Sequence, residues 1–167
     1  MRHRRLARER AIQFLFQYDL NPPGNREEAL DGFWSSQTTA AIKKEKDPAS
    51  WGEVKELPPP SEEDNAVRLF GETLINGVLD RVEELDSIIS KEVKNWDIDR
   101  IAKVDRSILR LAIYEMFYRE DIPPVVTINE AIDIAKKFST EKSGSFVNGI
   151  LDKIKAKLMR PSRSSAN

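Results

Sequence analysis

The segment DRSILRLAIYEMFYR, which begins at Asp105, constrains the fold more than any other part of the sequence. Its helical spacing places apolar side chains around most of the circumference: Ile108, Leu109, Leu111, Ala112, Ile113 and Met116. A helix that is apolar on nearly every side must be covered by other elements on nearly every side. We therefore expect a central, buried helix surrounded by several others.

An amphipathic helix is predicted close to the start of the chain. Its inner face has the 3.6-residue period of a helix and comprises Ala7, Ala11, Phe14, Leu15 and Tyr18. The sequence NPPG, starting at Asn21, ends it. A short helix is expected over residues 27–34.

Further helices are predicted from their start signals. Ser61 is a good N-cap and is followed by three acids, and an apolar stripe then continues through residues 62–94 as one kinked helix or two consecutive ones. Thr127 and Glu130 have the T-x-x-E spacing of a capping box at the start of the next helix. Ser143 can cap the last helix.

Two segments show no helical pattern. Residues 36–60 have no defensible period and end in three prolines, so we expect a long surface loop or insertion there. Residues 159–167 are expected to form a flexible tail. No convincing strand is present. The prediction is an all-α bundle of about six or seven helices, folded as one domain over residues 1–158.

The residues that most enzymes need are scarce in this sequence. The chain contains no cysteine and one histidine, His3, and its seven glycines are scattered rather than gathered in a phosphate-binding loop. We therefore expect a binding protein without catalysis, metal or cofactor. No apolar run approaches the roughly 18 residues of a membrane-spanning helix, and the lack of cysteine fits a cytoplasmic protein.

Charge is distributed unevenly along the chain. Residues 1–10 carry five arginines and one glutamate, a net +4, and the arginines are Arg2, Arg4, Arg5, Arg8 and Arg10. Residues 62–100 carry eleven acids and five bases, a net −6. A helix N-terminus disfavours cations, so the arginine cluster suggests that a polyanion such as nucleic acid neutralises it. The alternatives are a solvated, frayed helix start or a targeting peptide, and Glu9 argues against the latter.

Phe146 is a second candidate for nucleic-acid binding. It lies about 100° away from Val147, which is on the inner face of the last helix. An aromatic ring beside Lys142 near a helix N-terminus can stack on a base while phosphates meet cations and free N–H groups. The alternative is that Phe146 packs under the preceding loop.

Asp105 is a candidate for protein binding. It shares a helical face with Ile101, Ile108 and Ala112, and a carboxylate on an apolar face needs a partner if it is buried. It is either the N-cap of its helix or a recognition contact for a cationic group on another protein.

Three blocks of the sequence together resemble the NusB family of transcription antitermination proteins. These are RRLARERAIQFLFQYDL, VDRSILRLAIYEM and PPVVTINEAIDIAKKFSTEKSGSFVNGILDKI. The resemblance implies two packed helical subdomains and no catalysis. It also implies a heterodimer with the small-subunit ribosomal protein NusE, which binds the boxA element of ribosomal RNA leader transcripts within the RNA polymerase antitermination complex.

Matching positions with the family assigns roles to individual residues. Arg4, Arg5 and Arg8 correspond to its arginine-rich RNA-binding start. Phe146 corresponds to its aromatic residue near the start of the last helix, with Lys142 in the adjacent RNA-side loop. By the same matching, Asp105 is a contact to the ribosomal partner, and Asp99 is expected on the same surface.

The sequence departs from the family at Ser145, where many relatives have a basic residue, and in the extra length of residues 36–60. Two other functions stay open at this point. One is a helical protein–protein adaptor, and the other is a relative of the RNA-binding module of an rRNA cytosine methyltransferase. A homodimer that buries the RNA surface also stays open.

Overall fold

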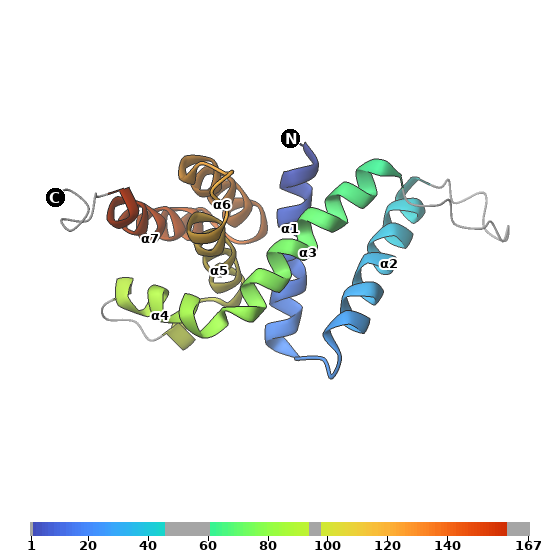
Figure 1. Ribbon diagram of the computed structural model, residues 1–167, viewed down its shortest axis with the longest axis horizontal. Coiled ribbons are helices and arrows are strands. Elements are labelled where there is room, and N and C mark those ends of the chain that lie inside the picture. Colours follow the sequence, from blue (N-terminus) through green and yellow to red (C-terminus); the bar gives the residue numbers. More distant parts are fainter. Residues whose placement is uncertain (1, 46–60, 94–97, 160–167) are drawn as a thin grey trace, which may run out of the picture.

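The computed structural model describes residues 2–45, 61–93 and 98–159, and over these residues the protein is all-α, as predicted (Figure 1). The helices are α1 (Arg2–Leu20), α2 (Arg26–Glu45), α3 (Glu62–Asp80), α4 (Val82–Glu92), α5 (Lys103–Tyr118), α6 (Pro124–Phe138) and α7 (Glu141–Met159), with a 3₁₀ helix, η2 (Ile98–Arg100), before α5. Within this described part, no helix combines the length and hydropathy needed to cross a membrane.

Helix α5 is the central element that its composition predicted. Every residue from Asp105 to Glu115 is buried. The helix contacts α1, α3, α4, α6 and α7, so its apolar residues meet neighbours on several sides. Burial of this continuous apolar surface supplies most of the driving force that holds the helices together.

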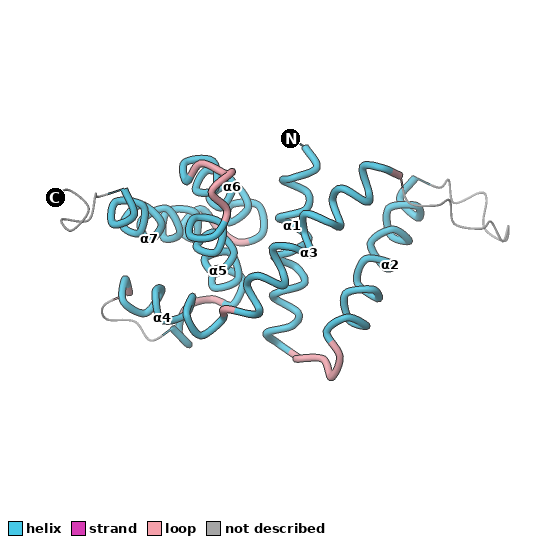
Figure 2. The backbone as a smooth tube through the Cα atoms, viewed as in Figure 1, coloured by secondary structure: helices cyan, strands magenta, loops and turns pink. Residues whose placement is uncertain are grey.

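The helices form two packed groups, α1–α3 and α4–α7 (Figures 1 and 2). In the first group α2 packs through aromatic side chains: the Phe14 and Phe33 rings meet edge to face with centroids 5.5 Å apart. Trp34 covers Gly71 of α3 so closely that an added Cβ would lie 3.0 Å from the indole. In the second group α6 and α7 are joined by only Ser139 and Thr140.

The prediction of a loop over residues 36–60 is wrong for its first part. Helix α2 starts at Arg26 and continues through residue 45, well past the predicted end at residue 34. No proline or glycine lies between residues 36 and 45, and alanine, lysine, glutamine and glutamate propagate a helix once it has started. Residues 46–60 lie outside the described residues, as do residues 160–167 of the predicted tail.

Capping signals in the sequence predicted one helix start correctly and another incorrectly. Ser61 caps α3 as predicted, and it forms a reciprocal capping box with Asp64. The predicted capping box at Thr127 is wrong, because α6 already starts at Pro124 and Thr127 is a buried interior residue. Proline fits the first helical position, since its φ is already helical and its missing N–H has no helical partner there.

Candidate nucleic-acid interface

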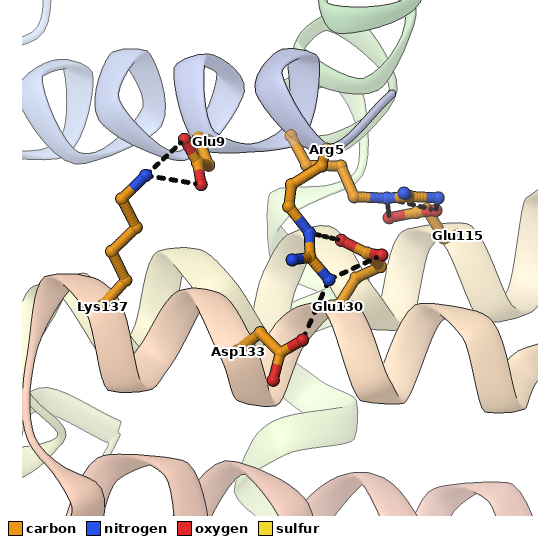
Figure 3. A network of polar contacts seen from close by, with 7 residues as sticks. Arg5, Glu9, Glu115, Glu130, Asp133 and Lys137 are labelled. Carbon is orange, nitrogen blue, oxygen red and sulfur yellow. Dashed lines mark hydrogen bonds and ion pairs between the residues drawn. The ribbon is translucent and has the colours of Figure 1, made fainter. Parts of the chain in front are cut away.

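The arginine-rich half of α1 lies along α6, and Arg5 connects the two helices (Figure 3). Its Nε donates to Glu130 at 2.7 Å, and its Nη2 donates to Asp133 at 2.9 Å. Hydrogen bonding to Glu130, together with the charges of both acids, raises the pKa of Arg5. The side chain is still 48% exposed, so Arg5 is paired but accessible to an external anion.

Arg8 has a different position from the one that sequence reasoning assigned to it. Its side chain is 4% exposed, and its Nη2 donates to Glu115 Oε1 at 2.7 Å. Its Nε donates to the same carboxylate at 3.0 Å. An enclosed guanidinium cannot reach RNA, so Arg8 is removed from the predicted RNA contacts. It neutralises a buried acid of α5 instead.

Arg4 is the second accessible arginine. Its guanidinium carbon lies 4.9 Å from the centroid of the Phe70 ring, where a cation is attracted to the aromatic face. Its nearest acid is Asp121, at 3.9 Å. Arg2 is the first residue of α1, and its side chain lies outside the described residues. Among the predicted arginine contacts whose side chains are described, Arg4 and Arg5 are therefore the accessible ones.

A lysine that was not assigned to the site makes a second link between α1 and α6. Lys137 Nζ donates to both carboxylate oxygens of Glu9, at 3.0 and 3.1 Å (Figure 3). In this link α6 supplies the cation and α1 the acid, whereas in the Arg5 pairs acids of α6 neutralise part of the basic helix start. Sequence reasoning missed this because acids that are more than a hundred residues away cannot be located from the pattern.

The start of α7 carries the other predicted RNA contacts. Lys142 is exposed, and Phe146 is half-buried with one part packed against the core. The helix is capped by Thr140, whose hydroxyl accepts the backbone N–H of Ser143 at 3.1 Å. The predicted cap at Ser143 is therefore wrong. Ser145 is exposed.

Asp105 is buried, with 6% of its surface exposed. Its Oδ2 accepts a hydrogen bond from the Ser143 hydroxyl at 3.0 Å, while its buried Oδ1 receives none from any described residue. Burial raises the pKa of Asp105, opposed by the Ser143 hydrogen bond. The N-cap of α5 is Ala102, which excludes the N-cap alternative for Asp105.

Asp99 lies in η2 and, unlike Asp105, is fully accessible, with 82% of its side chain exposed. One of its oxygens is 3.5 Å from Arg106 Nη1, and Arg106 also pairs with Asp19 at 2.6 Å. The two predicted partner contacts therefore differ: Asp99 presents a carboxylate at the surface, and Asp105 holds one beneath it.

These observations define the class of protein: a helical binding module with accessible cations on α1 and at the start of α7, and acids at the start of α5. Among the residues that the structure describes, no three acids or histidines gather as a metal site would require.

Comparison with known proteins identifies the family. The sequence profile of the NusB family matches residues 5–156, so the chain belongs to the NusB family. The transcription antitermination protein NusB of Bacillus subtilis (strain 168) is 42% identical, and the match covers 92% of this chain and 95% of that protein.

Solved structures agree with this assignment. T. maritima NusB superposes with a TM-score of 0.67 at 32% identity, covering 98% of this chain and 97% of that chain. A chain in a crystal structure of the antitermination factors NusB and NusE in complex with double-stranded RNA gives a TM-score of 0.68 at 28% identity. That match covers 94% of this chain and 98% of the other.

Proposed function

We propose that this protein is a transcription antitermination factor that binds RNA together with NusE and performs no catalysis itself. Its relatives are named transcription antitermination proteins, and a structurally similar NusB chain was solved with NusE and RNA. The observation on this chain that carries the proposal is the pair of accessible arginines, Arg4 and Arg5, on a helix start that disfavours cations.

In the proposed mechanism the arginines hold the RNA backbone and the start of α7 contacts its bases. Phosphate contacts from Arg4 and Arg5 supply affinity and orientation. Phe146, which keeps part of its ring accessible, stacks on an unpaired base, with Lys142 beside it. Both groups of contacts are on helices that touch α6, α1 through ion pairs and α7 through packing, and the proposal is that one RNA strand engages both.

The finer parts of the proposal concern the partners. The RNA is the boxA element of ribosomal RNA leader transcripts, and the complex acts with RNA polymerase in the cytoplasm. NusE docks on the surface around Asp99 and Asp105, where the exposed Asp99 carboxylate can pair with a cationic group of a basic protein. A homodimer of the free protein that covers the RNA surface belongs to the same proposal.

The test is fluorescence anisotropy with a labelled single-stranded boxA RNA, with and without NusE, over a range of salt concentrations. We expect binding that weakens steeply with salt and is reduced in Arg5→Ala. Arg26→Ala is the matched control, because Arg26 is also a surface arginine paired with an acid, Asp80 at 2.9 Å, but lies on α2. Equal affinities of these two variants would contradict the assignment of Arg5.

A second variant tests the aromatic contact. Phe146→Leu keeps apolar volume for the half-buried part of the site but removes the ring that stacks on a base. We expect weaker RNA binding with little change in thermal stability. If the protein binds NusE but no RNA at any salt concentration, the adaptor function replaces the proposed one.

A further inference from the structure

A single hydrogen bond connects the two proposed binding surfaces. Asp105, at the start of α5, belongs to the proposed partner surface, and it accepts the Ser143 hydroxyl at 3.0 Å. Ser143 lies next to Lys142 and one helical turn before Phe146, both on the proposed RNA surface. The two surfaces therefore share a contact between buried groups, although their residues are far apart in the sequence.

Ser143 is also the centre of a small hydroxyl cluster at the start of α7. Its hydroxyl lies 2.8 Å from that of Ser139 and 3.3 Å from that of Thr140. Its backbone N–H donates to Thr140 Oγ1 at 3.1 Å. Because Ser143 is itself buried, these contacts fix its side chain at the start of α7, and its hydrogen bond to Asp105 connects that turn to α5.

Close packing limits how this turn can move. The next residue, Gly144, faces the Lys136 side chain of α6 so closely that an added Cβ would lie 2.9 Å from Lys136 Cγ. A shift of the first turn of α7 toward α6 would therefore displace that lysine. The position of the turn depends on its packing on α6 and on the hydrogen bond to Asp105.

Asp105 is only partly satisfied by the fold. A carboxylate has two oxygens that accept hydrogen bonds, and the Oδ1 of Asp105 is buried without a donor from the described residues. A buried polar atom without a partner is costly, so a cationic donor from a docking protein would gain by reaching it. Because the atom is covered, this donor can reach it only if the start of α5 or α7 adjusts.

We propose that Ser143 is a positioning residue that couples docking of the basic partner at Asp105 to the presentation of Lys142 and Phe146 to RNA. The inference rests on the proposed function. The partner engages Asp105, and the Asp105–Ser143 hydrogen bond transmits the change to the first turn of α7. Linkage makes the effect reciprocal, so bound RNA strengthens partner binding by the same factor.

The experiment compares RNA dissociation constants without and with saturating NusE, using the labelled boxA RNA. The coupling is measured as the dissociation constant without NusE divided by the dissociation constant with NusE, so a larger ratio means stronger coupling. We expect Ser143→Ala to lower this ratio about three- to tenfold, as the loss of one buried hydrogen bond allows. Ser145→Ala, the same chemical change at an exposed position two residues away, is expected to keep the wild-type ratio.

Two further variants separate coupling from folding. Ser143→Thr keeps the hydroxyl and is expected to retain most of the ratio. Asp105→Asn retains the side-chain shape, and we expect it to lower the ratio as Ser143→Ala does. If Ser143→Ala unfolds in a thermal scan, Asp105→Asn decides the result.

The inference and the proposed function fail in different ways. A wild-type ratio in a folded Ser143→Ala or Asp105→Asn variant overturns the coupling alone, since RNA and partner still bind. Absence of RNA or NusE binding by the wild-type protein overturns the proposed function, and the coupling with it.

Discussion

The two ends of α5 bury a carboxylate each, and the fold satisfies them very differently. Glu115, near the C-terminal end, is completely buried and accepts hydrogen bonds from both Nε and Nη2 of Arg8. Asp105, near the N-terminal end, is nearly as buried but accepts one hydrogen bond, from the neutral hydroxyl of Ser143. Among the residues that the structure describes, Glu115 has a cation of its own and Asp105 has none.

This difference separates a structural acid from a candidate functional one. The Arg8–Glu115 pair joins α1 to α5 and is closed to solvent, so an external ligand has no access to it. Asp105 has one covered oxygen without a donor from the described residues, which a donor on another molecule can reach once the start of α5 or α7 adjusts. A buried charge with a complete set of partners contributes to a specific fold, whereas an incomplete set is a place to look for a binding partner.

The largest effect is expected for Arg8→Ala. It leaves Glu115 buried without its cation, and breaking one side of a buried ion pair costs about 3–5 kcal/mol in the free energy of unfolding. Urea denaturation followed by circular dichroism measures the change. A loss below about 1 kcal/mol would mean that Arg8 is not the buried structural cation described here, and would return it to the RNA surface.

Removal of both charges sharpens the same test. Replacing Arg8 with Met and Glu115 with Leu leaves no unpaired charge, so we expect the double variant to recover much of the stability that Arg8→Ala loses. RNA affinity of the folded double variant should then stay close to that of the wild type, since neither side chain is accessible.

The next effect concerns Asp105→Asn and depends on pH. Burial raises the pKa of Asp105 above its ordinary value of 3.8, so the folded state binds its proton more tightly than the unfolded state. The free energy of unfolding of the wild type relative to Asp105→Asn is therefore largest at pH values below 3.8. It loses stability relative to the variant as the pH rises through the folded-state pKa.

Parallel urea titrations of both proteins from acidic to neutral pH measure this difference in the free energy of unfolding. Subtracting one curve from the other removes the effect of pH on the groups that both proteins share. Over this pH range we expect the difference in free energy of unfolding between the two proteins to change by no more than about 1–2 kcal/mol, because only one partly satisfied polar group is involved. A difference that does not vary with pH would contradict the raised pKa of Asp105.

A smaller effect on stability is expected for Arg5→Ala, which contrasts a surface cation with the buried Arg8. Exposed ion pairs contribute about 0–1 kcal/mol, so the free energy of unfolding should change little even though two acids lose their partner. Denaturation measured beside Arg8→Ala checks the contrast. Equal destabilisation by the two variants would break it.

The smallest effect is expected for Glu130→Gln. Arg5 donates to Glu130 and Asp133 in the free protein, so RNA has to compete with these acids for the guanidinium. Removing the charge of one acid should raise RNA affinity a few-fold, the scale of one exposed ion pair. Weaker RNA binding in the variant would mean that Glu130 orients Arg5 toward RNA instead of competing for it.

Predictions from sequence succeeded where the signal was local. The sequence correctly predicted three features: the apolar residues around α5, the inner face of α1 and the Ser61 cap. Periodicity and capping depend on residues only a few positions apart, so they can be recognised in the sequence. The end of α2 and the start of α6 were misjudged. In α2 helix-forming residues continue the helix past Trp34, and in α6 Pro124 starts the helix before Thr127.

For the candidate site, the sequence identified the residue types but not their surroundings. Arg5 and Arg8 are three positions apart in one basic run, and no pattern in that run distinguishes them. In the fold Arg5 is half exposed beside two acids of α6, while Arg8 is enclosed with Glu115 of α5. The distinction depends on which helix each side chain meets.

The sequence by itself determined the helices, the central position of α5 and the resemblance to the NusB family, because these depend on short-range spacing and composition. Only the tertiary structure decided which charges are accessible and which acids neutralise them. Burial and ion pairing are set by side chains brought together across more than a hundred residues, and the free energy of a charge depends on that environment. The same reason explains why the link from Asp105 to Ser143 became visible only in the folded chain.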